Sequence, residues 1–418
     1  MNKKKKFLAW VWVALCSLAI FLIVPVARTI QKFVSAHWGR SLFGYAVLAA
    51  VGVAFLFLLY FLVFKLKIRS PSNYIWLTAI ACLYVYFTLK LWRTPEQAIH
   101  FLEYGVLGYF LFHALSLSIR DKSIYFVAFL SGSLIGIFDE ILQWMIPERY
   151  FDFRDIGLNA LAVGLFQMAL WKGIKPKIIA EKIGPKSIKA LSLLVAVNLI
   201  LLGACASNTP GRVAGYVERF PLLSWLLKEE PMNEFTQKHE DPEIGVFYSR
   251  LSANLLKQTD EVQGDHYALV LLDWKEKDYS QFLRLHNPLI HPFLYEMRVH
   301  IFRRDKKEEE AEKARNEKAR REALFVSYKE NLILEKYFTR ALQKSSYAWS
   351  PEKKKNLEAH IDKAKPYRSP VSAGFFRITE KTVWLTIILI LIALAVLNYF
   401  ISFSFCQKYR RSGKGRRR

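Results

Sequence analysis

The chain has 418 residues, of which 53% are hydrophobic and 15% aromatic, and its mean hydropathy is +0.13. Its formal net charge is +24, from 60 Lys and Arg against 36 Asp and Glu. No nucleic-acid recognition motif accompanies this charge, so we do not expect a nucleic-acid partner. The hydrophobic residues instead form long runs between charged segments, which is typical of a polytopic membrane protein with a substantial water-soluble part.

The hydrophobic runs predict the membrane segments. A helix needs about 20 consecutive apolar residues to cross the core of a bilayer. Eight runs approach this length: residues 7–27, 42–64, 74–92, 98–119, 123–146, 156–172, 189–205 and 382–405. The first run exceeds the core of about 7–15 residues found in a cleaved signal peptide, so we expect it to remain as the first helix.

These runs predict an all-α polytopic fold with about eight transmembrane helices and a mostly helical extracytoplasmic domain. The predicted divisions are a membrane domain of six transmembrane helices at 1–188, a seventh transmembrane helix or lipoprotein-signal-like segment at 189–205, the extracytoplasmic domain at 206–381, a C-terminal transmembrane helix at 382–405 and a basic cytoplasmic tail at 406–418.

Charged loops predict the orientation of the helices. Alternate loops are basic, and they are residues 3–6, 65–69, 119–122, 172–189 and 408–418. Because Lys and Arg are retained on the cytoplasmic side of a membrane, both termini are expected in the cytoplasm. Residues 206–381 and the loop between the fifth and sixth helices are then expected outside. The basic flanks also suit contact with anionic lipid headgroups.

The predicted extracytoplasmic domain contains a strongly charged stretch, RRDKKEEEAEKARNEKARRE at 303–322. Strong helix formers with mixed charges at three and four spacing indicate a solvated helix or helical hairpin, with a partner-binding helix as the alternative. The domain also contains six histidines: His239, His266, His286, His291, His300 and His360. Structural or surface roles are favoured for them over a metal site, because Pro288 and the spacing of HNPLIH do not fit one helical face.

The four cysteines, Cys16, Cys82, Cys205 and Cys406, form neither a disulfide framework nor a CxxC metal site. Cys205 ends KSIKALSLLVAVNLILLGACAS at 186–207, which has the basic start, apolar core and small residues of a lipoprotein signal. Lipidation of Cys205 is therefore an alternative to an ordinary membrane span.

Polar residues gather where the fourth, fifth and sixth helices are expected to meet the outer face. Helical spacing places His100, Glu103 and Tyr104 on one face, Glu140 and Gln143 on another, and Asp155 and Asn159 on a third. Asp139 points about 100° away from Glu140. Charges at bilayer depth cost at least about 2.5 kcal/mol and usually face a bundle interior, so a shared polar site is predicted. Capping roles are favoured for Glu148, Asp152 and Arg154.

The residue types at this site allow several chemistries. The guanidinium of Arg149 suits phosphate or carboxylate. Glu140, with Glu103 or Asp155, could act as general acid or base if burial separates their pKa values. His100 and the carboxylates are an alternative set of ligands for a divalent cation, but H-x-x-E is a weak signal. We assign no metal and no cofactor.

The order of these residues resembles the signature of VanZ-like membrane proteins, over roughly residues 40–172. The matching positions are His100, Tyr104, Leu107 and Gly108, then Glu140, Gln143, Pro147, Arg149, Asp152, Asp155 and Asn159. One departure is Ala162, where a glycine is expected, which puts close helix packing there in doubt. The resemblance implies a helical protein of the bacterial cell envelope, in a family named for an accessory factor in teicoplanin resistance.

The resulting hypothesis is an inner-membrane (plasma-membrane) protein whose site recognises an anionic, lipid-linked or cell-wall precursor. His100, Glu103, Tyr104, Gln143, Arg149 and Asn159 are the predicted ligand-binding residues, and Glu140 and Asp155 are the hypothetical catalytic residues. The alternatives are a membrane scaffold whose outer domain binds a protein partner, and an acid–base enzyme acting on an envelope lipid. The sequence does not decide between binding and catalysis, and membrane lipids are expected partners in each case.

Overall fold

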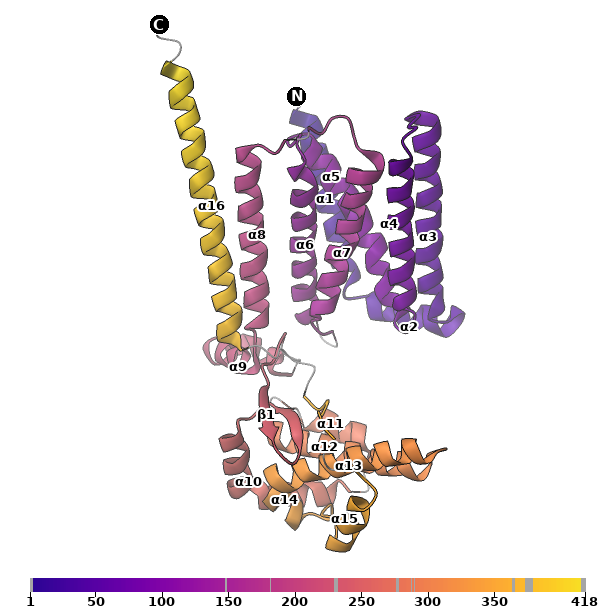
Figure 1. The fold of residues 1–418 in the computed structure, drawn as a ribbon, viewed down its shortest axis with the longest axis vertical. Coiled ribbons are helices and arrows are strands. Elements are labelled where there is room, and N and C mark those ends of the chain that lie inside the picture. Colours follow the sequence, from indigo (N-terminus) through magenta and orange to yellow (C-terminus); the bar gives the residue numbers. More distant parts are fainter. Residues whose placement is uncertain are drawn as a thin grey trace. The chain divides into compact units, whose positions relative to one another are not determined.

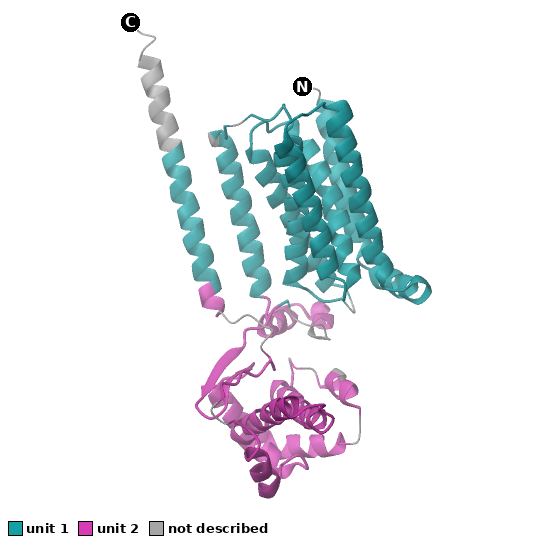
Figure 2. Ribbon diagram, turned by 45° about the vertical axis from the view of Figure 1, so that its right-hand side comes forward, with its two compact units in different colours: residues 1–207, 229–232, 383–418 teal, residues 208–228, 233–382 magenta. Residues whose placement is uncertain are grey.

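The computed structural model describes residues 3–146, 149–180, 182–228, 232–275, 278–286, 288, 290–362, 365–372 and 379–414. The chain forms two compact units (Figure 2). Unit 1 consists of residues 1–207, 229–232 and 383–418, and unit 2 of residues 208–228 and 233–382.

Unit 1 is a helical bundle. Its α-helices are α1 (Lys3–Ile23), α2 (Ala27–Trp38), α3 (Ser41–Tyr60), α4 (Pro71–Lys90), α5 (His100–Ser116), α6 (Ser123–Trp144), α7 (Phe153–Met168), α8 (Pro185–Ala206) and most of α16 (Glu380–Lys414). The π-helices η1 (Phe61–Lys65) and η3 (Ala169–Ile174) extend α3 and α7, and the short 3-10 helix η2 (Pro95–Ile99) leads into α5.

Seven helices in the described part of the chain are long and apolar enough to cross a membrane. They are Lys3–Ile23, Ser41–Lys65, Pro71–Lys90, Pro95–Ser116, Ser123–Trp144, Lys186–Ala206 and Glu380–Ile401. The shorter α7 has 16 residues, continues directly into η3, and packs against α5 and α6 inside the bundle. These helices confirm the expectation of an all-α polytopic membrane protein.

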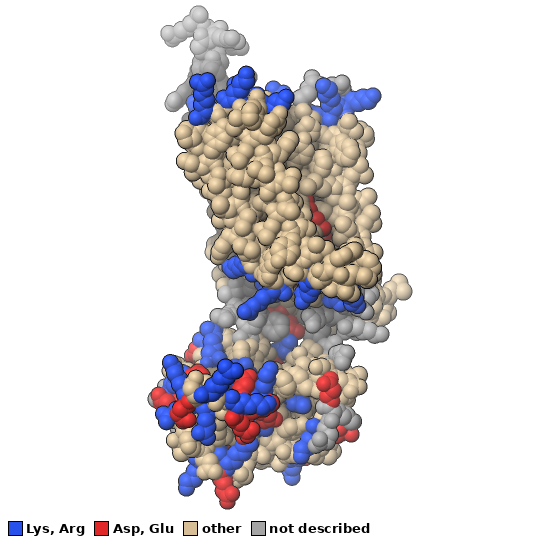
Figure 3. Space-filling model, turned by 90° about the vertical axis from the view of Figure 1, so that its right-hand side faces the viewer, with Lys and Arg blue, Asp and Glu red and all other residues tan. Residues whose placement is uncertain are grey.

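The centre of the bundle is formed by α5, α6 and α7, with α1 packed on α5 and α8 packed on α6 (Figure 1). Its core contains Tyr104, Leu107, Leu111, Ala128 and Val163. On the face drawn in Figure 3, the surface of unit 1 is mostly uncharged apart from a small acidic patch, and Lys and Arg gather at its two ends. Such a surface fits the hydrocarbon core of a bilayer with headgroups on either side.

Hydrogen bonds and a close helix approach join α8 to α16. The indole Nε1 of Trp384 donates a hydrogen bond to Oγ of Ser207 over 2.7 Å. Gly203 allows α16 to approach closely, because a Cβ at this position would lie 2.6 Å from Cδ1 of Ile387. The last membrane helix is thereby held beside α8 although some 170 residues separate them along the chain.

An amphipathic helix that the sequence analysis did not predict lies between the first two membrane helices. This helix, α2, has 12 residues, which is too short to cross a bilayer. Figures 1 and 2 show it across one end of the bundle rather than along it. Phe33 and Trp38 on α2 are exposed, at 54% and 63%. A short helix with exposed aromatic residues at this level is typical of the membrane interface.

Unit 2 is mostly helical. Its elements are α9 (Pro210–Arg219), the 3-10 helix η4 (Pro221–Lys228), β1 (Gln237–Asp241), β2 (Gly245–Ser249), α10 (Ala253–Asp273), α11 (Tyr279–Leu285), α12 (Pro292–Glu312), α13 (Glu317–Tyr337), α14 (Thr339–Lys344) and α15 (Pro351–Glu358). The strands form an antiparallel hairpin that pairs Gln237 with Ser249 and Asp241 with Gly245. Gly245 has a φ of 105°, a conformation that favours glycine.

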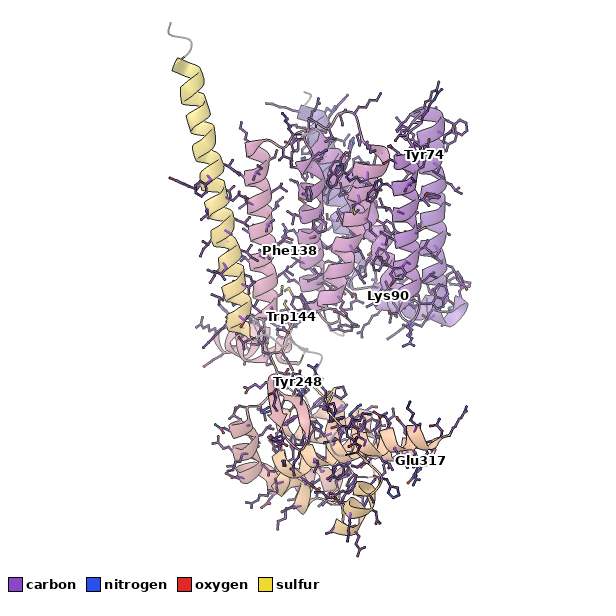
Figure 4. The ribbon with its side chains drawn as sticks, viewed as in Figure 1. Tyr74, Lys90, Phe138, Trp144, Tyr248 and Glu317 are labelled. Carbon is purple, nitrogen blue, oxygen red and sulfur yellow. The ribbon has the colours of Figure 1, made fainter. Side chains whose placement is uncertain are left out.

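The charged stretch at 303–322 forms the adjoining ends of α12 and α13, which pack together as a helical hairpin. Glu317, labelled in Figure 4, lies at the start of α13 where the hairpin turns. Nearer the core, Phe293, Met297 and Ile333 are buried between the helices. The sequence is thus solvated at the tip of the hairpin and apolar at its base.

A buried carboxylate ties the end of unit 2 to this hairpin. Glu330 on α13 accepts hydrogen bonds from Nε of Arg303 over 2.8 Å, Oγ of Ser369 over 2.9 Å and the hydroxyl of Tyr367 over 2.5 Å, and it lies 2.5 Å from Nδ1 of His300. Burial raises the pKa of Glu330, but His300, Tyr367 and Arg303 outweigh that effect, so its pKa lies below its ordinary value.

The six histidines of unit 2 are dispersed. His300 is buried against Glu330, and His239 is buried with its Nε2 3.0 Å from the carbonyl oxygen of Leu251. The rings of His286 and His291 lie 6.3 Å apart between their centroids. Among the residues that the structure describes, no group of three or more His, Cys, Asp or Glu side chains is arranged to hold a metal ion.

Two glycines of α6 determine how closely α7 approaches. A Cβ at Gly132 would lie 2.6 Å from Cγ2 of Val163, and a Cβ at Gly136 would lie 2.9 Å from Cβ of Asn159. Both distances are shorter than two side chains tolerate. Ala162, the departure from the family pattern, is buried and its carbonyl oxygen accepts a hydrogen bond from the Tyr84 hydroxyl over 2.8 Å. The close packing therefore depends on glycines of α6.

We predict that Gly132→Ala destabilises the bundle by about 1–3 kcal/mol, because the added methyl group overpacks the contact with Val163. The thermal unfolding midpoint of the full-length protein in detergent should fall. Gly157→Ala in α7 is the matched control, since no atom lies within 4 Å of a Cβ at Gly157. Adding Val163→Ala to Gly132→Ala should recover part of the loss. Equal midpoints for Gly132→Ala and the wild type would contradict this account.

Candidate functional site

A cavity of about 800 Å³, lined by charged and apolar residues, lies at one end of the unit 1 bundle. Its wall is formed by the end of α1, by α2, by the start of α3, by η2 and the first turn of α5, by the end of α6 and by the segment leading into α7. In Figure 4, Lys90 marks this end of α4 and Trp144 this end of α6, whereas Tyr74 marks the opposite end.

The cavity wall carries charges of both signs. The basic residues are Arg28, Lys32, Arg40 and Arg149, and the acidic residues are Glu96, Glu103, Asp139 and Asp155. Arg40 and Nε2 of Gln31 both donate to Oε1 of Glu96, the latter over 2.9 Å. These bonds connect α2 and the residue before α3 with η2, so the wall contributed by α2 is fixed in place.

The end of α6 is joined to the start of α7 through Glu140, which is fully buried. Nε2 of Gln143 donates to Oε1 of Glu140 over 2.5 Å, and the backbone N–H of Asp152 donates to Oε2 over 3.0 Å. The guanidinium of Arg149 in turn donates to Oε1 of Gln143. Glu140 thus lies behind Gln143 and positions both Arg149 and the turn before α7.

Two pairs that involve α5 lie at this cavity. Nδ1 of His100 lies 3.5 Å from Oε2 of Glu103, and both residues line the wall. The hydroxyl of Tyr104 donates to Oδ2 of Asp139 over 3.1 Å. Oδ1 of Asp139 is buried without a hydrogen-bond partner among the described residues.

The structure brings most of the predicted residues together. His100, Glu103, Gln143, Arg149 and Asp155 line the cavity, and Glu140 and Tyr104 each bond to a residue in its wall. Asn159 differs, because it is buried between α6 and α7 against Gly136 and does not line the cavity. Neither amide atom of Asn159 has a hydrogen-bond partner among the described residues.

Sequence reasoning missed many polar residues of the wall, including those of α2 and η2 and Asp139 on α6. Asp139 was set aside because it points away from Glu140, yet it lines the cavity and bonds to Tyr104. Gln97 precedes the predicted α5 segment, and its Nε2 donates to Oδ1 of Asp155 over 3.2 Å. The sequence did contain a signal for Asp139. Helical spacing places Tyr104 on the same face as His100, and a buried tyrosine hydroxyl there needs a partner on a neighbouring helix.

Asp152 and Arg154, two of the three residues predicted to have capping roles, make local contacts at the start of α7. Oδ1 of Asp152 accepts from the backbone N–H of Arg154 over 2.8 Å at the start of α7, as an N-cap does. Arg154 also pairs with Asp152 over 3.1 Å. Pro147 and Glu148 lie outside the described residues. Cys205 is 3% exposed in the last turn of α8, and its lipidation stays a prediction.

The fold and the cavity define a class: a polytopic α-helical membrane protein with a cavity between helix ends that is lined by charged and apolar residues. Residues 10–172 match the family model described as VanZ/LLP1, from α1 into η3. This membrane segment is therefore VanZ-like, and a further domain follows it. The match begins earlier than the region around 40–172 in which the motif was recognised. No curated protein and no solved structure matches the chain.

We predict that Glu140→Ala lowers the thermal unfolding midpoint and increases protease cleavage near residues 149–152. The substitution removes the acceptor of the Gln143 amide and the Asp152 N–H, and each buried unpaired donor costs about 1–3 kcal/mol. Glu140→Gln retains one carbonyl oxygen and should lose less. Glu103→Gln is the control, because Glu103 is a partly exposed carboxylate of the same cavity. Equal effects of Glu140→Ala and Glu103→Gln would exclude a positioning role for Glu140.

Proposed function

We propose that this protein is a VanZ-like component of the bacterial cell envelope, in the inner (plasma) membrane, that recognises an anionic envelope component. The ligand would be a lipid-linked or cell-wall precursor, and a link to glycopeptide resistance is part of the proposal. One observation carries it: four basic side chains, Arg28, Lys32, Arg40 and Arg149, line a single cavity at the end of a membrane bundle.

The apolar part of the wall supports an amphipathic ligand. Ile20, Ile23 and Val24 of the end of α1 and Phe43 of α3 lie beside the charged residues. A cavity of about 800 Å³ also falls in the range of about 300–1,000 Å³ usual for small-molecule sites. An anionic headgroup carrying a hydrocarbon chain would contact both the charged and the apolar parts of the wall, whereas a small inorganic anion would leave the apolar part uncovered.

In this proposal Arg149 binds the anion, since a guanidinium can donate two parallel hydrogen bonds to phosphate or carboxylate. Gln143 orients Arg149, and Glu140 fixes Gln143. Asp155 and Glu103 would receive donor groups of the ligand, such as hydroxyls or amides. Asn159 contributes by packing between α6 and α7 and not by contact, given its place against Gly136.

The acid–base enzyme remains the second candidate, because three carboxylates besides Glu96, together with a histidine, line one cavity beside the proposed anion site. These are Glu103, Asp139, Asp155 and His100. Asp155 is the better placed of the two hypothetical catalytic residues, since it lies in the wall and Glu140 does not. A scaffold role would rest on unit 2, where the charged α12–α13 hairpin offers a protein-binding surface.

We propose that the cavity faces outward and that both termini are cytoplasmic, on the strength of the basic loops at the opposite end of the bundle. The test uses a membrane-impermeant maleimide on spheroplasts producing single-cysteine variants of the full-length protein. Val262→Cys on α10 should label in intact spheroplasts, and Arg69→Cys only after lysis, because both positions are exposed and lie on opposite sides in this topology. The reverse pattern would contradict the orientation.

We predict that Arg149→Gln weakens binding of a polyprenyl phosphate by about tenfold, since a charge-assisted hydrogen bond contributes about 1.5–3 kcal/mol and tenfold is about 1.4 kcal/mol. Native mass spectrometry of the full-length protein would compare undecaprenyl phosphate with undecaprenol. The matched control is Arg154→Gln, whose side chain is 85% exposed and does not line the cavity.

The result is informative in either direction. The proposal requires the phosphate to bind more tightly than the alcohol, and only Arg149→Gln to reduce the difference. If the two ligands bind equally, or if Arg154→Gln causes the same loss, recognition of the anion by this cavity is wrong.

A further inference from the structure

The short segment that follows α8 carries large apolar side chains on the surface of unit 2. It comprises α9 and η4, residues 210–228, with the sequence PGRVAGYVERFPLLSWLLK. In α9, Val213, Tyr216 and Val217 share one face, and Phe220 follows at the next turn. Arg212, Glu218 and Arg219 lie elsewhere around the helix. The segment is thus amphipathic, with Glu218 as its only acidic residue.

Part of this apolar surface has no protein cover. Leu222 is 93% exposed and Phe220 is 63% exposed. Leu222 is thus more exposed than Val53 on membrane helix α3, which is 68% exposed, and Phe220 is only slightly less exposed than Val53. Burying large apolar side chains is favourable, so two exposed ones separated by a single residue favour a second surface that covers them.

Chain connectivity limits where the segment can lie. Three residues, 207–209, separate the end of membrane helix α8 at Ala206 from the start of α9 at Pro210. Because an extended chain advances at most about 3.6 Å per residue, α9 begins within roughly 14 Å of the end of α8. The headgroup region on each face of a bilayer is about 5–7 Å deep, so α9 starts in or directly beside it.

A second connection comes from the other membrane helix. Arg212 on α9 pairs with Oε1 of Glu380 over 2.6 Å. Glu380 is the first residue of α16, whose first 22 residues are apolar enough to cross a membrane. The start of α9 is therefore held near the ends of two membrane helices, one by the chain and one by an ion pair.

We propose that residues 210–228 form an interfacial anchor that inserts Phe220 and Leu222 into the lipid of the membrane crossed by α8 and α16. The partner is the bilayer itself, at the level of its headgroups. Tyr216 and Trp225 are residues that prefer this level, because one end of each side chain is apolar and the other polar. Arg219 would lie beside lipid phosphates, and the absence of other acids besides Glu218 limits repulsion from them.

This inference does not depend on the ligand of the cavity. It assigns to unit 2 a contact with lipid that restricts its motion relative to the membrane surface. A second copy of the chain and bulk water are the competing environments for the exposed side chains, and the experiment separates all three.

The test uses the full-length protein, with its native cysteines replaced, at one chain per lipid nanodisc of phosphatidylcholine and phosphatidylglycerol. Nitroxide labels would be placed at Phe220→Cys and Leu222→Cys. Val53→Cys on α3 is the lipid reference, Glu218→Cys is the matched site on the polar side of α9, and Val262→Cys, 76% exposed on α10, is an apolar residue outside the segment. Power saturation would measure accessibility to oxygen and to a polar nickel chelate.

We expect oxygen to be favoured over the nickel chelate at 220 and 222, as at 53, and the nickel chelate to be favoured at 218 and 262. Nickel access at 222 equal to that at 218 would place the side chain in water and overturn the proposal. Low access to both reagents at 222 would indicate burial in protein and overturn it as well. Since each disc holds one chain, lipid-like access at 222 cannot come from a second copy.

Discussion

A carboxylate buried at the end of a membrane helix must have its oxygens partnered, and in this protein Glu140 imposes that constraint on its surroundings. Its partners are the side-chain amide of Gln143 and the backbone N–H of Asp152. The first fixes a side chain on the last turns of α6, and the second fixes the turn that leads into α7. Arg149 faces the cavity and donates to Gln143, so the position of its guanidinium depends on Glu140, which does not face the cavity.

The polar end of the bundle also depends on close packing deeper within it. Gly132 and Gly136 let α7 approach α6, and Val163 and Asn159 occupy the space that side chains at these glycines would fill. If the two helices separated, the Asp152 N–H would move away from Glu140. The small residues and the buried carboxylate therefore act on the same pair of helices, one through shape and the other through hydrogen bonding.

Much of this arrangement could be predicted from the sequence, because each signal was local. The apolar runs gave the membrane helices, and i, i+3 spacing placed Glu140 and Gln143 on a common face. The element α2 was missed because 12 residues with Arg28 and Lys32 do not satisfy a criterion based on length and hydropathy. The hairpin of β1 and β2 was missed because two strands of five residues leave little periodic signal in a helical chain.

The errors at the site have a different origin. A helical projection gives the angle between side chains of one helix, but not how many neighbours surround that helix. Asp139 was excluded on its angle from Glu140, although α5 lies on that side and supplies Tyr104. Asn159 was included on its polarity, although its direction leads to Gly136. The roles of both residues depend on contacts between helices, and a single sequence without homologues does not reveal these contacts.

The helix α2, which the sequence analysis did not predict, relates the cavity to the lipid. Arg28, Gln31 and Lys32 of α2 line the cavity, whereas Phe33 and Trp38 of the same helix are exposed. A helix across the end of a bundle, with aromatic residues exposed, lies where headgroups meet hydrocarbon. One short helix thus presents polar residues to the cavity and aromatic residues to its surroundings. An anion attached to a hydrocarbon chain has its charge and its chain on the two sides of the level where headgroups meet hydrocarbon, which supports our proposal of such a ligand for this cavity.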